Sequence, residues 1–356
     1  MDEPVANLDE IRALSGHLPG PDLEAGSLAA TRQAQLTKPA GALGRLEELA
    51  VWLATWQARH PPRVDHPRTL VFAGNHGVAA RSVSAYPAAV TAQMVQNFIA
   101  GGAAVNQLCR VFDVGLKVYE MNLDTPTADI VDAPAMSEEE CAKAMAYGMM
   151  AVEPGIDVLA LGEMGIGNTT AAAALCGGLF GGDAEMWTGP GTGVSGAALE
   201  LKRRVVGQAI ARHRPAARDP FDLLRRLGGL EFAAIVGAVM AARLGRVPVV
   251  LDGFASTAAA AVLHAADPHA LDHCIVGHVS AEPGHRRLLE RIGQQPLFDL
   301  GMRLGEGSGA TLALAVLKAA GACHNGMATF AEARVSGPSQ PTVGAPIPGS
   351  FASVKI

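Results

Sequence analysis

The chain of 356 residues carries a net charge of −6, and its Lys and Arg are scattered along the sequence. This pattern argues against a general nucleic-acid surface, which needs a concentrated basic footprint. Hydrophobic residues make up 49% but aromatic residues only 4%, so we expect a core of Ala, Val and Leu. Together with 41 glycines, this composition is typical of layered α/β enzymes.

Neither the start of the chain nor its cysteines indicate export. The first residues, MDEPVANLDEIRAL, lack the basic and apolar regions of a secretory signal, and no apolar run reaches the roughly 18 residues of a membrane helix. The five cysteines are odd in number and form no C-x-x-C pair, which favours reduced thiols over a disulfide framework or a zinc cluster. We therefore expect a cytoplasmic protein.

In chain order, the hydrophobic pattern predicts helices first and then strands that alternate with helices. The expected elements are helices to about residue 60, including 46–57 and stopped by Pro61 and Pro62; a strand at 69–73; a helical stretch at 86–112 with a break at Gly101 and Gly102; a strand within 115–123; a helix from 137; a strand starting at 156; a helix at 198–214; one or two helices at 221–245; a strand from 247 that ends in Asp252 and Gly253; a strand within 273–285; and a helix at 305–327.

Strands that alternate with helices indicate a parallel sheet covered by helices. In such sheets ligands gather at the carboxyl ends of the strands. Four motifs follow strands in this interpretation: GNHG (74–77), GEMGIGNTT (162–170), DGFAS (252–256) and SAEPGH (280–285). These motifs are therefore the first candidates for a functional site.

The motif GEMGIGNTT combines a glycine turn with two threonines at the expected start of a helix. Gly165 and Gly167 let the backbone approach a ligand closely, and exposed N–H groups with the hydroxyls of Thr169 and Thr170 could hold phosphate. The motif is neither a Walker A loop nor G-x-G-x-x-G. The alternative is an ordinary helix-cap turn in which Glu163 is a solvated loop residue.

A second motif, LGEGSGA (304–310), places Glu306 between two glycines in apolar surroundings. Such a carboxylate is either exposed or held in a cleft with a raised pKa, which suits a general base. Glu163 and Glu306 could also form a glycosidase pair. Glycine and threonine loops fit a phosphorylated ligand better than a neutral sugar chain.

Other polar residues have both functional and structural interpretations. Ser280 and Gly284 suit an anion or a helix start. Lys202 lies beside Arg203 and Arg204, and so by default on a solvated face.

A lone His76 near a strand end is more often structural, and no histidines reach H-E-x-x-H spacing, so we expect no catalytic metal. Ser84, Tyr86 and Gln93 could line a flat aromatic pocket, or form a turn and an amphipathic helix. Ser256 is not in G-x-S-x-G, which argues against a hydrolase triad.

Eight stretches along the chain carry a resemblance to a known family. They are KPAGALGRLE, AYPAAVTAQMVQNFIAGGAAVN, LGEMGIGNTT, GTG, LDGFAST, SAEPGH, LGEGSGA and CHNGMATFAEA, in this order. Together they resemble the nicotinate-nucleotide:5,6-dimethylbenzimidazole phosphoribosyltransferase family of cobalamin lower-ligand assembly, from about residue 10 to residue 335.

The resemblance implies transfer of phosphoribose from nicotinate mononucleotide to a ring nitrogen of 5,6-dimethylbenzimidazole, with inversion at the anomeric carbon. The products are α-ribazole 5′-phosphate and nicotinate. The resemblance implies no metal and no cofactor, because the pyridinium is already an activated leaving group.

The resemblance also implies roles for residues that match the family's motifs. Glu306 is the expected general base, and Glu163 is expected to contact the ribose or to support the charged transition state. The residues expected around phosphate and ribose are Gly165, Gly167, Asn168, Thr169, Lys202, Ser280 and Gly284. Those expected around the benzimidazole are Ser84, Tyr86, Gln93, Met164 and Leu304.

The implied fold is a Rossmann-like parallel sheet flanked by helices, in a homodimer. We expect a small helical domain from 1–62 plus 308–335, a large α/β substrate-binding domain at 63–307, and a loose Gly/Pro/Ser-rich tail at 336–356.

The chain departs from the family pattern at Asn75, where an acid is expected before the histidine, and at Pro190 in GPGTG, which is followed by Ser195-Gly196 instead of two acids. These departures leave open a non-catalytic protein that binds a nucleotide or a cobamide precursor, and, with less support, a phosphosugar-binding hydrolase. The two retained glutamates argue against a binding protein, which has no need of a base.

Overall fold

The computed structural model describes residues 7–337, which fold as two compact units. One unit comprises residues up to Pro19 together with His66–Leu314, and the other comprises Gly20–Asp65 together with the residues from Ala315 onward. The predicted tail at 336–356 lies outside the described residues except for its first two positions.

The larger unit is built on a five-stranded parallel sheet with the strand order β2-β1-β3-β4-β5. Its strands are β1 (Pro67–Ala73), β2 (Gly115–Glu120), β3 (Val158–Met164), β4 (Val249–Leu251) and β5 (Cys274–Val276). In the centre of the sheet, Phe72 of β1 pairs with Glu163 of β3, and Leu161 of β3 pairs with Leu251 of β4. The predicted parallel α/β sheet is confirmed, and each expected strand is present.

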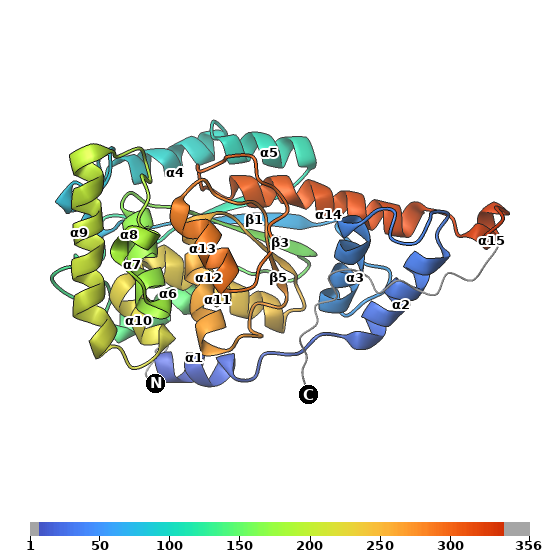
Figure 1. The fold of residues 1–356 in the computed structure, drawn as a ribbon, viewed down its shortest axis with the longest axis horizontal. Coiled ribbons are helices and arrows are strands. Elements are labelled where there is room, and N and C mark those ends of the chain that lie inside the picture. Colours follow the sequence, from blue (N-terminus) through green and yellow to red (C-terminus); the bar gives the residue numbers. More distant parts are fainter. Residues whose placement is uncertain (1–6, 338–356) are drawn as a thin grey trace. The chain divides into compact units, whose positions relative to one another are not determined.

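Helices cover both faces of this sheet. In Figure 1, α4 and α5 lie along one side of the sheet, and α6, α11 and α12 lie along the other. The helical elements that include residues of this unit are α1 (Leu8–Ser15), η1 (Gly77–Arg81), α4 (Val90–Ala100), α5 (Ala104–Phe112), α6 (Glu138–Met150), α7 (Asn168–Phe180), α8 (Ala184–Trp187), α9 (Gly196–His213), η2 (Arg214–Ala216), α10 (Pro220–Leu227), α11 (Leu230–Leu244), α12 (Phe254–Ala266), α13 (Pro283–Arg291) and the first turns of α14 (Ser308–Gly326). The predicted break at Gly101 and Gly102 separates α4 from α5.

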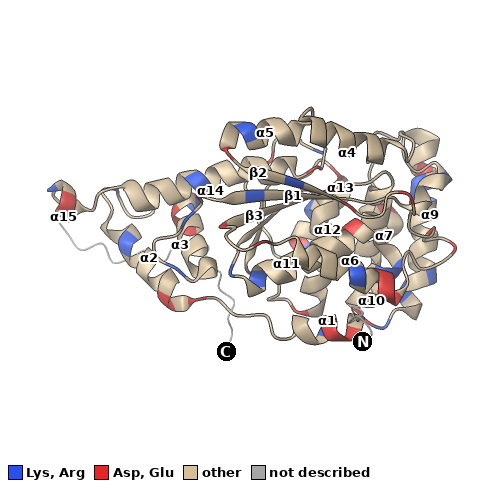
Figure 2. Cartoon of the chain, turned by 180° about the vertical axis from the view of Figure 1, so that it is seen from behind, with Lys and Arg blue, Asp and Glu red and all other residues tan. Residues whose placement is uncertain are grey.

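The core is made of small residues, as the composition predicts. Residues 171–174 of α7 and 258–261 of α12 are all alanine and are fully buried, and these two helices pack against each other. Short side chains let helix axes approach closely, which compensates for the scarcity of aromatic residues. Figure 2 shows Lys and Arg interspersed with Asp and Glu along the elements. Within residues 7–337, none of the helices has the combined length and apolar character needed to cross a membrane.

The smaller unit is helical and has its own buried core. It contains α2 (Leu23–Gln35), α3 (Arg45–Gln57), the later turns of α14 and α15 (Phe330–Ala333). Leu36, Trp52 and Leu53 are buried in it. A Cβ atom on Gly26 would lie 2.5 Å from Thr55 Oγ1, so α2 and α3 pack closely at this glycine.

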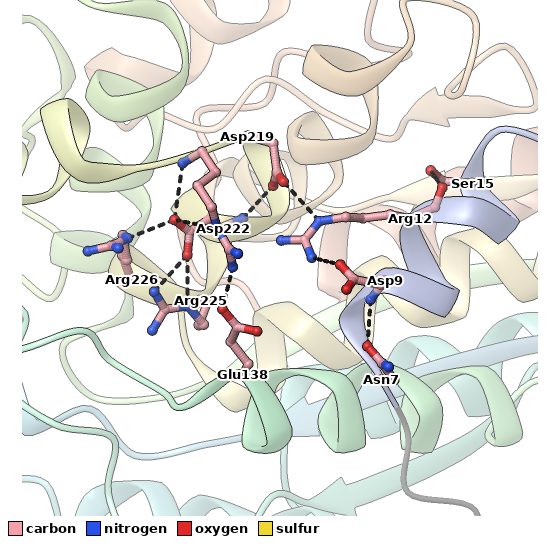
Figure 3. Close-up of polar contacts among 10 residues, drawn as sticks. Asn7, Asp9, Arg12, Ser15, Glu138, Asp219, Asp222, Arg225 and Arg226 are labelled. Atoms are coloured by element: carbon pink, nitrogen blue, oxygen red, sulfur yellow. Dashed lines mark hydrogen bonds and ion pairs between the residues drawn. The ribbon is translucent and has the colours of Figure 1, made fainter.

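A network of ion pairs in the larger unit connects α1 with α10 (Figure 3). Arg12 Nε of α1 lies 2.8 Å from Asp219 Oδ2, the N-cap of α10. Asp222 in the first turn of α10 has a fully buried side chain that accepts from Arg225 at 2.7 Å and Arg226 at 2.9 Å. Burial alone would raise the pKa of Asp222, but the hydrogen bonds from Arg226 and Arg225 outweigh it and lower the pKa.

We expect Asp222→Asn to reduce the free energy of unfolding by about 2 kcal/mol at neutral pH, because two charge-assisted hydrogen bonds are weakened in a buried place. Urea denaturation followed by circular dichroism measures this change. A lowered pKa means that the contribution is complete above the unfolded-state pKa of Asp and is lost as pH falls through the folded-state value. The difference between the two proteins should therefore shrink in acid, and a constant difference would contradict this account.

Candidate active site

The two glutamates of the LGE motifs lie in one site. Glu163 is the penultimate residue of β3, and Glu306 lies in the loop before α14. The backbone N–H of Glu306 donates to the backbone carbonyl of Glu163 at 3.1 Å. The two residues are 8% and 5% exposed, so the alternatives of a solvated Glu163 and an exposed turn Glu306 are wrong.

The backbone of the Glu306 loop has an unusual conformation that brings it close to β3. Gly305, Glu306 and Gly307 have φ angles of 83°, 64° and 73°, and such a left-handed run is uncommon for a residue with a side chain. A Cβ atom on Gly305 would lie 2.6 Å from Glu163 Oε1, and one on Gly162 would collide with the backbone of Gly307. The glycines at 162, 305 and 307 therefore allow close contact between the loop and the strand.

Asp252 at the end of β4 holds this loop in place. Its Oδ2 accepts from the Gly307 N–H at 3.1 Å, and its Oδ1 accepts from the Ala310 N–H at 2.8 Å. The carboxylate therefore satisfies two donors at the start of α14, where helices leave N–H groups unpaired. The sequence places Asp252 at a strand end, which is the signal that could have assigned it to the site.

The carboxylates in this site shift one another's ionisation. Burial raises the pKa of Glu163 well above its usual value, and the charges of Asp252, Glu231 and Glu306 raise it further, whereas a hydrogen bond from Asn168 Nδ2 opposes them. Burial, followed by the charge of Asp252, raises the pKa of Glu306 to about 7. A ligand that carries or develops positive charge favours the ionised forms of these carboxyl groups, so the site suits such a ligand.

Glu306 has an oxygen available to receive a proton. Its Oε2 is buried and has no hydrogen-bond partner among residues 7–337. A carboxylate with a pKa near 7 is partly ionised at neutral pH, and it can accept a proton and release it again. This geometry and pKa suit a general base.

Lys202 is buried beside the start of α7, so the interpretation of a solvated face is wrong. It is 1% exposed, and its Nζ donates to Thr169 Oγ1 at 2.8 Å and to the Gly189 carbonyl at 3.0 Å. An ammonium has three N–H donors, so one remains. Within the described part of the chain, the Thr169 hydroxyl proton has no acceptor either. These two donors could bind an anion such as phosphate.

Gly165 and Gly167 form the tight turn between β3 and α7. A Cβ atom on Gly165 would lie 2.5 Å from the Gly74 carbonyl, and Gly167 has a φ of 97°. The Ile166 N–H of this turn donates to Thr91 Oγ1 at 3.1 Å. The glycines thus let the chain turn close to β1, and they place Asn168 and Thr169 at the start of α7.

The buried side chain of His285 holds the loop of the SAEPGH motif in place. His285 Nδ1 accepts from the Ser280 N–H at 2.8 Å, and its Nε2 lies 3.1 Å from Thr257 Oγ1. Burial lowers the pKa of His285 to about 3, so the imidazole is neutral near pH 7 and adds no positive charge. Gly284 makes room for a neighbouring backbone, because a Cβ atom there would lie 2.6 Å from the Trp187 carbonyl.

The residues expected around an aromatic base come from three segments. Ser84 and Tyr86 lie in the loop before α4, Gln93 lies in the first turn of α4, Met164 ends β3, and Leu304 precedes Glu306. Ser84 Oγ lies 2.9 Å from Thr192 Oγ1 of the GPGTG loop, which connects this group to the loop that carries Gly191. Tyr86 and Leu304 are exposed, whereas Met164 is partly buried.

Two further site residues were missed by the sequence interpretation. Glu231 opens α11, and its Oε1 lies 2.5 Å from His76 Nε2 in a fully buried pair. No sequence signal marks Glu231, because it heads a long apolar stretch. Glu282 lies within the SAEPGH motif, which pointed to its neighbours Ser280 and Gly284. The structural role predicted for His76 is consistent with this pairing, and Asn75 Nδ2 donates to the Leu123 carbonyl at 2.9 Å.

Comparisons with known proteins identify close relatives over nearly the whole chain. A family model described as phosphoribosyltransferase matches residues 18–335. A nicotinate-nucleotide–dimethylbenzimidazole phosphoribosyltransferase of Sinorhizobium medicae is 58% identical over 328 residues, which cover 92% of this chain and 97% of the relative. That of Brucella anthropi is 56% identical over 329 residues, with the same coverage of 92% and 97%. The crystal structure of the protein of this name from Thermus thermophilus has 41% identity and a TM-score of 0.82, and the match covers 89% of this chain and 100% of that one.

Proposed function

The chain belongs to the nicotinate-nucleotide–dimethylbenzimidazole phosphoribosyltransferase family, and from this premise we propose how its residues perform the family's reaction. The enzyme transfers phosphoribose from nicotinate mononucleotide to a ring nitrogen of 5,6-dimethylbenzimidazole. The products are nicotinate and α-ribazole 5′-phosphate, which is used to build the lower ligand of cobalamin. The observation that carries the residue assignments is the pair of buried glutamates, Glu163 and Glu306, which come together from two distant motifs.

Glu306 is the general base of the proposed mechanism. One imidazole nitrogen of the acceptor attacks the anomeric carbon while the bond to the pyridinium nitrogen breaks and its electron pair returns to nicotinate. The second imidazole nitrogen then gives up its proton to the Glu306 carboxylate. The unpartnered Oε2 and the pKa of about 7 support this role.

Glu163 stabilises the sugar in this proposal. Displacement at the anomeric carbon builds positive charge on the ribose, and a carboxylate in a buried place stabilises such charge more than one in water does. The hydrogen bond from Asn168 supports the role because it holds the carboxylate in one orientation. Asn168 thus assists through Glu163 as well as by lying next to the ribose.

We assign the phosphate of the donor and the benzimidazole acceptor to two separate sets of residues. Lys202 and Thr169 supply the remaining donors for phosphate, with Ser280 and the glycines at 165, 167 and 284 shaping the surrounding loops. For the benzimidazole, the proposed residues are Ser84, Tyr86, Gln93, Met164 and Leu304. Exposed apolar surface at Tyr86 and Leu304 supports a flat aromatic ligand there.

A direct assay tests the proposal. The protein is incubated with nicotinate mononucleotide and 5,6-dimethylbenzimidazole, and both nicotinate and α-ribazole 5′-phosphate are quantified by mass spectrometry. We expect equal amounts of the two products. Absence of nicotinate release with benzimidazole, purine and phenolic acceptors alike would refute the activity, and ribose phosphate as the sole sugar product would indicate a hydrolase.

The homodimer implied by the resemblance and the cytoplasmic location expected from the sequence are part of this proposal. Ile99, Val111 and Met150 are exposed apolar side chains on α4, α5 and α6, and their exposure supports a contact with a second copy. The five free cysteines, four of them buried, support a reducing compartment. Sedimentation velocity tests the dimer, and a monomer at micromolar concentration would contradict it.

A further inference from the structure

Glu282 makes a contact that its position in the chain does not explain. It is the N-cap residue of α13, yet its side chain makes no capping bond. Its Oε1 instead accepts from the N–H of Gly191, in a different loop, at 2.8 Å. Its Oε2 is buried and has no hydrogen-bond partner among the described residues. A half-satisfied buried carboxylate is costly to retain, so it calls for a functional reason.

Glu282 and Lys202 act on the same short segment. Lys202 Nζ donates to the Gly189 carbonyl at 3.0 Å, and a Cβ atom on Gly191 would lie 2.7 Å from this Nζ. A Cβ atom on Gly189 would collide with Glu282 Oε2. The backbone at 189–191 is therefore in contact with the ammonium and with the carboxylate, and glycines at both positions leave room for them. The Gly191 carbonyl also accepts from Arg303 Nη1 at 2.8 Å.

Few other charges act on Lys202. Its two hydrogen-bond partners, the Thr169 hydroxyl and the Gly189 carbonyl, are neutral. Charged neighbours on the surrounding helices are engaged elsewhere: Arg203 of α9 pairs with Glu185 of α8 and with Glu200, and Arg286 of α13 pairs with Asp299. Burial lowers the pKa of Lys202 to about 8, and the charge of Glu282 opposes this shift.

We propose that Glu282 is a positioning residue for the donor phosphate, because it keeps the Lys202 ammonium charged and fixes Gly191 beside it. This inference rests on the proposed function, in which Lys202 binds the phosphate of nicotinate mononucleotide. Burial raises the pKa of Glu282, whereas Lys202, the Gly191 N–H and Arg303 lower it, so each of the two groups favours the charged form of the other.

The inference predicts a particular pH dependence. The ammonium binds phosphate only while it is protonated, so the KM for the donor rises as pH increases beyond the pKa of Lys202. Without the Glu282 charge, burial acts unopposed and this pKa falls further. The rise in donor KM should then begin at a lower pH.

Glu282→Gln tests the charge separately from the contact, because its amide oxygen can still accept from the Gly191 N–H. At a pH of about 8 we expect the donor KM to rise about fivefold, and at higher pH to approach a tenfold rise, if the pKa of Lys202 falls by about one unit. At a pH of about 6 the donor KM should match that of the wild type, and kcat at saturating donor should change little. A donor KM with the same pH dependence as the wild type would overturn the inference.

Two further variants keep the test decisive if Glu282→Gln is poorly folded. Glu282→Asp retains the charge and loses reach, so the donor KM should rise at every pH without a shift of the alkaline limb. Lys202→Arg has a side chain that stays protonated, so its donor KM should be independent of pH. A shifted limb in Glu282→Asp, or a donor KM of Lys202→Arg that depends on pH, would contradict the inference. Failure of the wild type to release nicotinate would instead refute the proposed function.

Discussion

Replacing Glu306 with Gln is expected to lower kcat by about 100-fold or more, the usual contribution of a general base. Gln has the size and shape of Glu but cannot take the imidazole proton. The Glu306 N–H to Glu163 carbonyl bond and the left-handed loop are backbone features, so they remain in the variant. The loss should therefore appear in kcat rather than in the KM for either substrate.

The pH dependence of the wild type supplies an independent check on Glu306. The base must be ionised, and its pKa is raised to about 7. The rate should accordingly increase as pH rises through about 7, and this acid limb should disappear in Glu306→Gln. Glu290→Gln, which changes an exposed glutamate of α13, is the matched control and should behave as the wild type. Near-normal turnover of Glu306→Gln would remove this residue from the role.

Glu163→Gln is expected to reduce kcat by roughly 100- to 1,000-fold, the range seen when one stabilising group is removed from a preorganised site. Burial raises the pKa of the Glu163 carboxyl in the free protein, and the charges of Asp252, Glu231 and Glu306 raise it further. A ligand that becomes cationic favours the ionised form, so the negative charge is greatest when it is needed. Gln cannot respond in this way, although it keeps the contact with Asn168.

Single-turnover kinetics with nicotinate mononucleotide separate the two possible roles of Glu163. If Glu163 acts on the transition state, the variant should bind the donor with an affinity close to that of the wild type and should transfer phosphoribose slowly. Glu163→Asp retains the charge and should recover part of the rate. Unchanged kinetics in Glu163→Gln would overturn the role, and a loss confined to donor KM would make Glu163 a binding residue only.

The sheet could be predicted from the sequence because its strands are short apolar runs, separated by segments in which apolar residues recur at helical spacing. The order of the strands could not, since pairing between distant segments leaves no trace in local periodicity. The site was predictable where a motif fixes the backbone. Glycines beside Glu163 and Glu306 indicated tight turns before two helices, and the structure brings both side chains into one site.

The burial of some site residues could not be predicted from local sequence patterns. Lys202 stands next to Arg203 and Arg204, and only the path of the 189–191 loop decides that one of the three is buried. Glu231 lies at the start of the apolar helix α11, and it belongs to the site because this start lies next to His76. In both cases the partner lies far away in sequence, so no local pattern marks the residue.

The two LGE motifs look like copies of each other, but the structure gives them a reciprocal relation. The glycine of the first motif, Gly162, is needed by the backbone of Gly307, and the glycine of the second, Gly305, is needed by the side chain of Glu163. A side chain at either glycine would therefore displace a part of the other motif. Libraries that aim to alter the accepted base should leave these glycines fixed and vary the exposed positions Tyr86, Gln93 and Leu304.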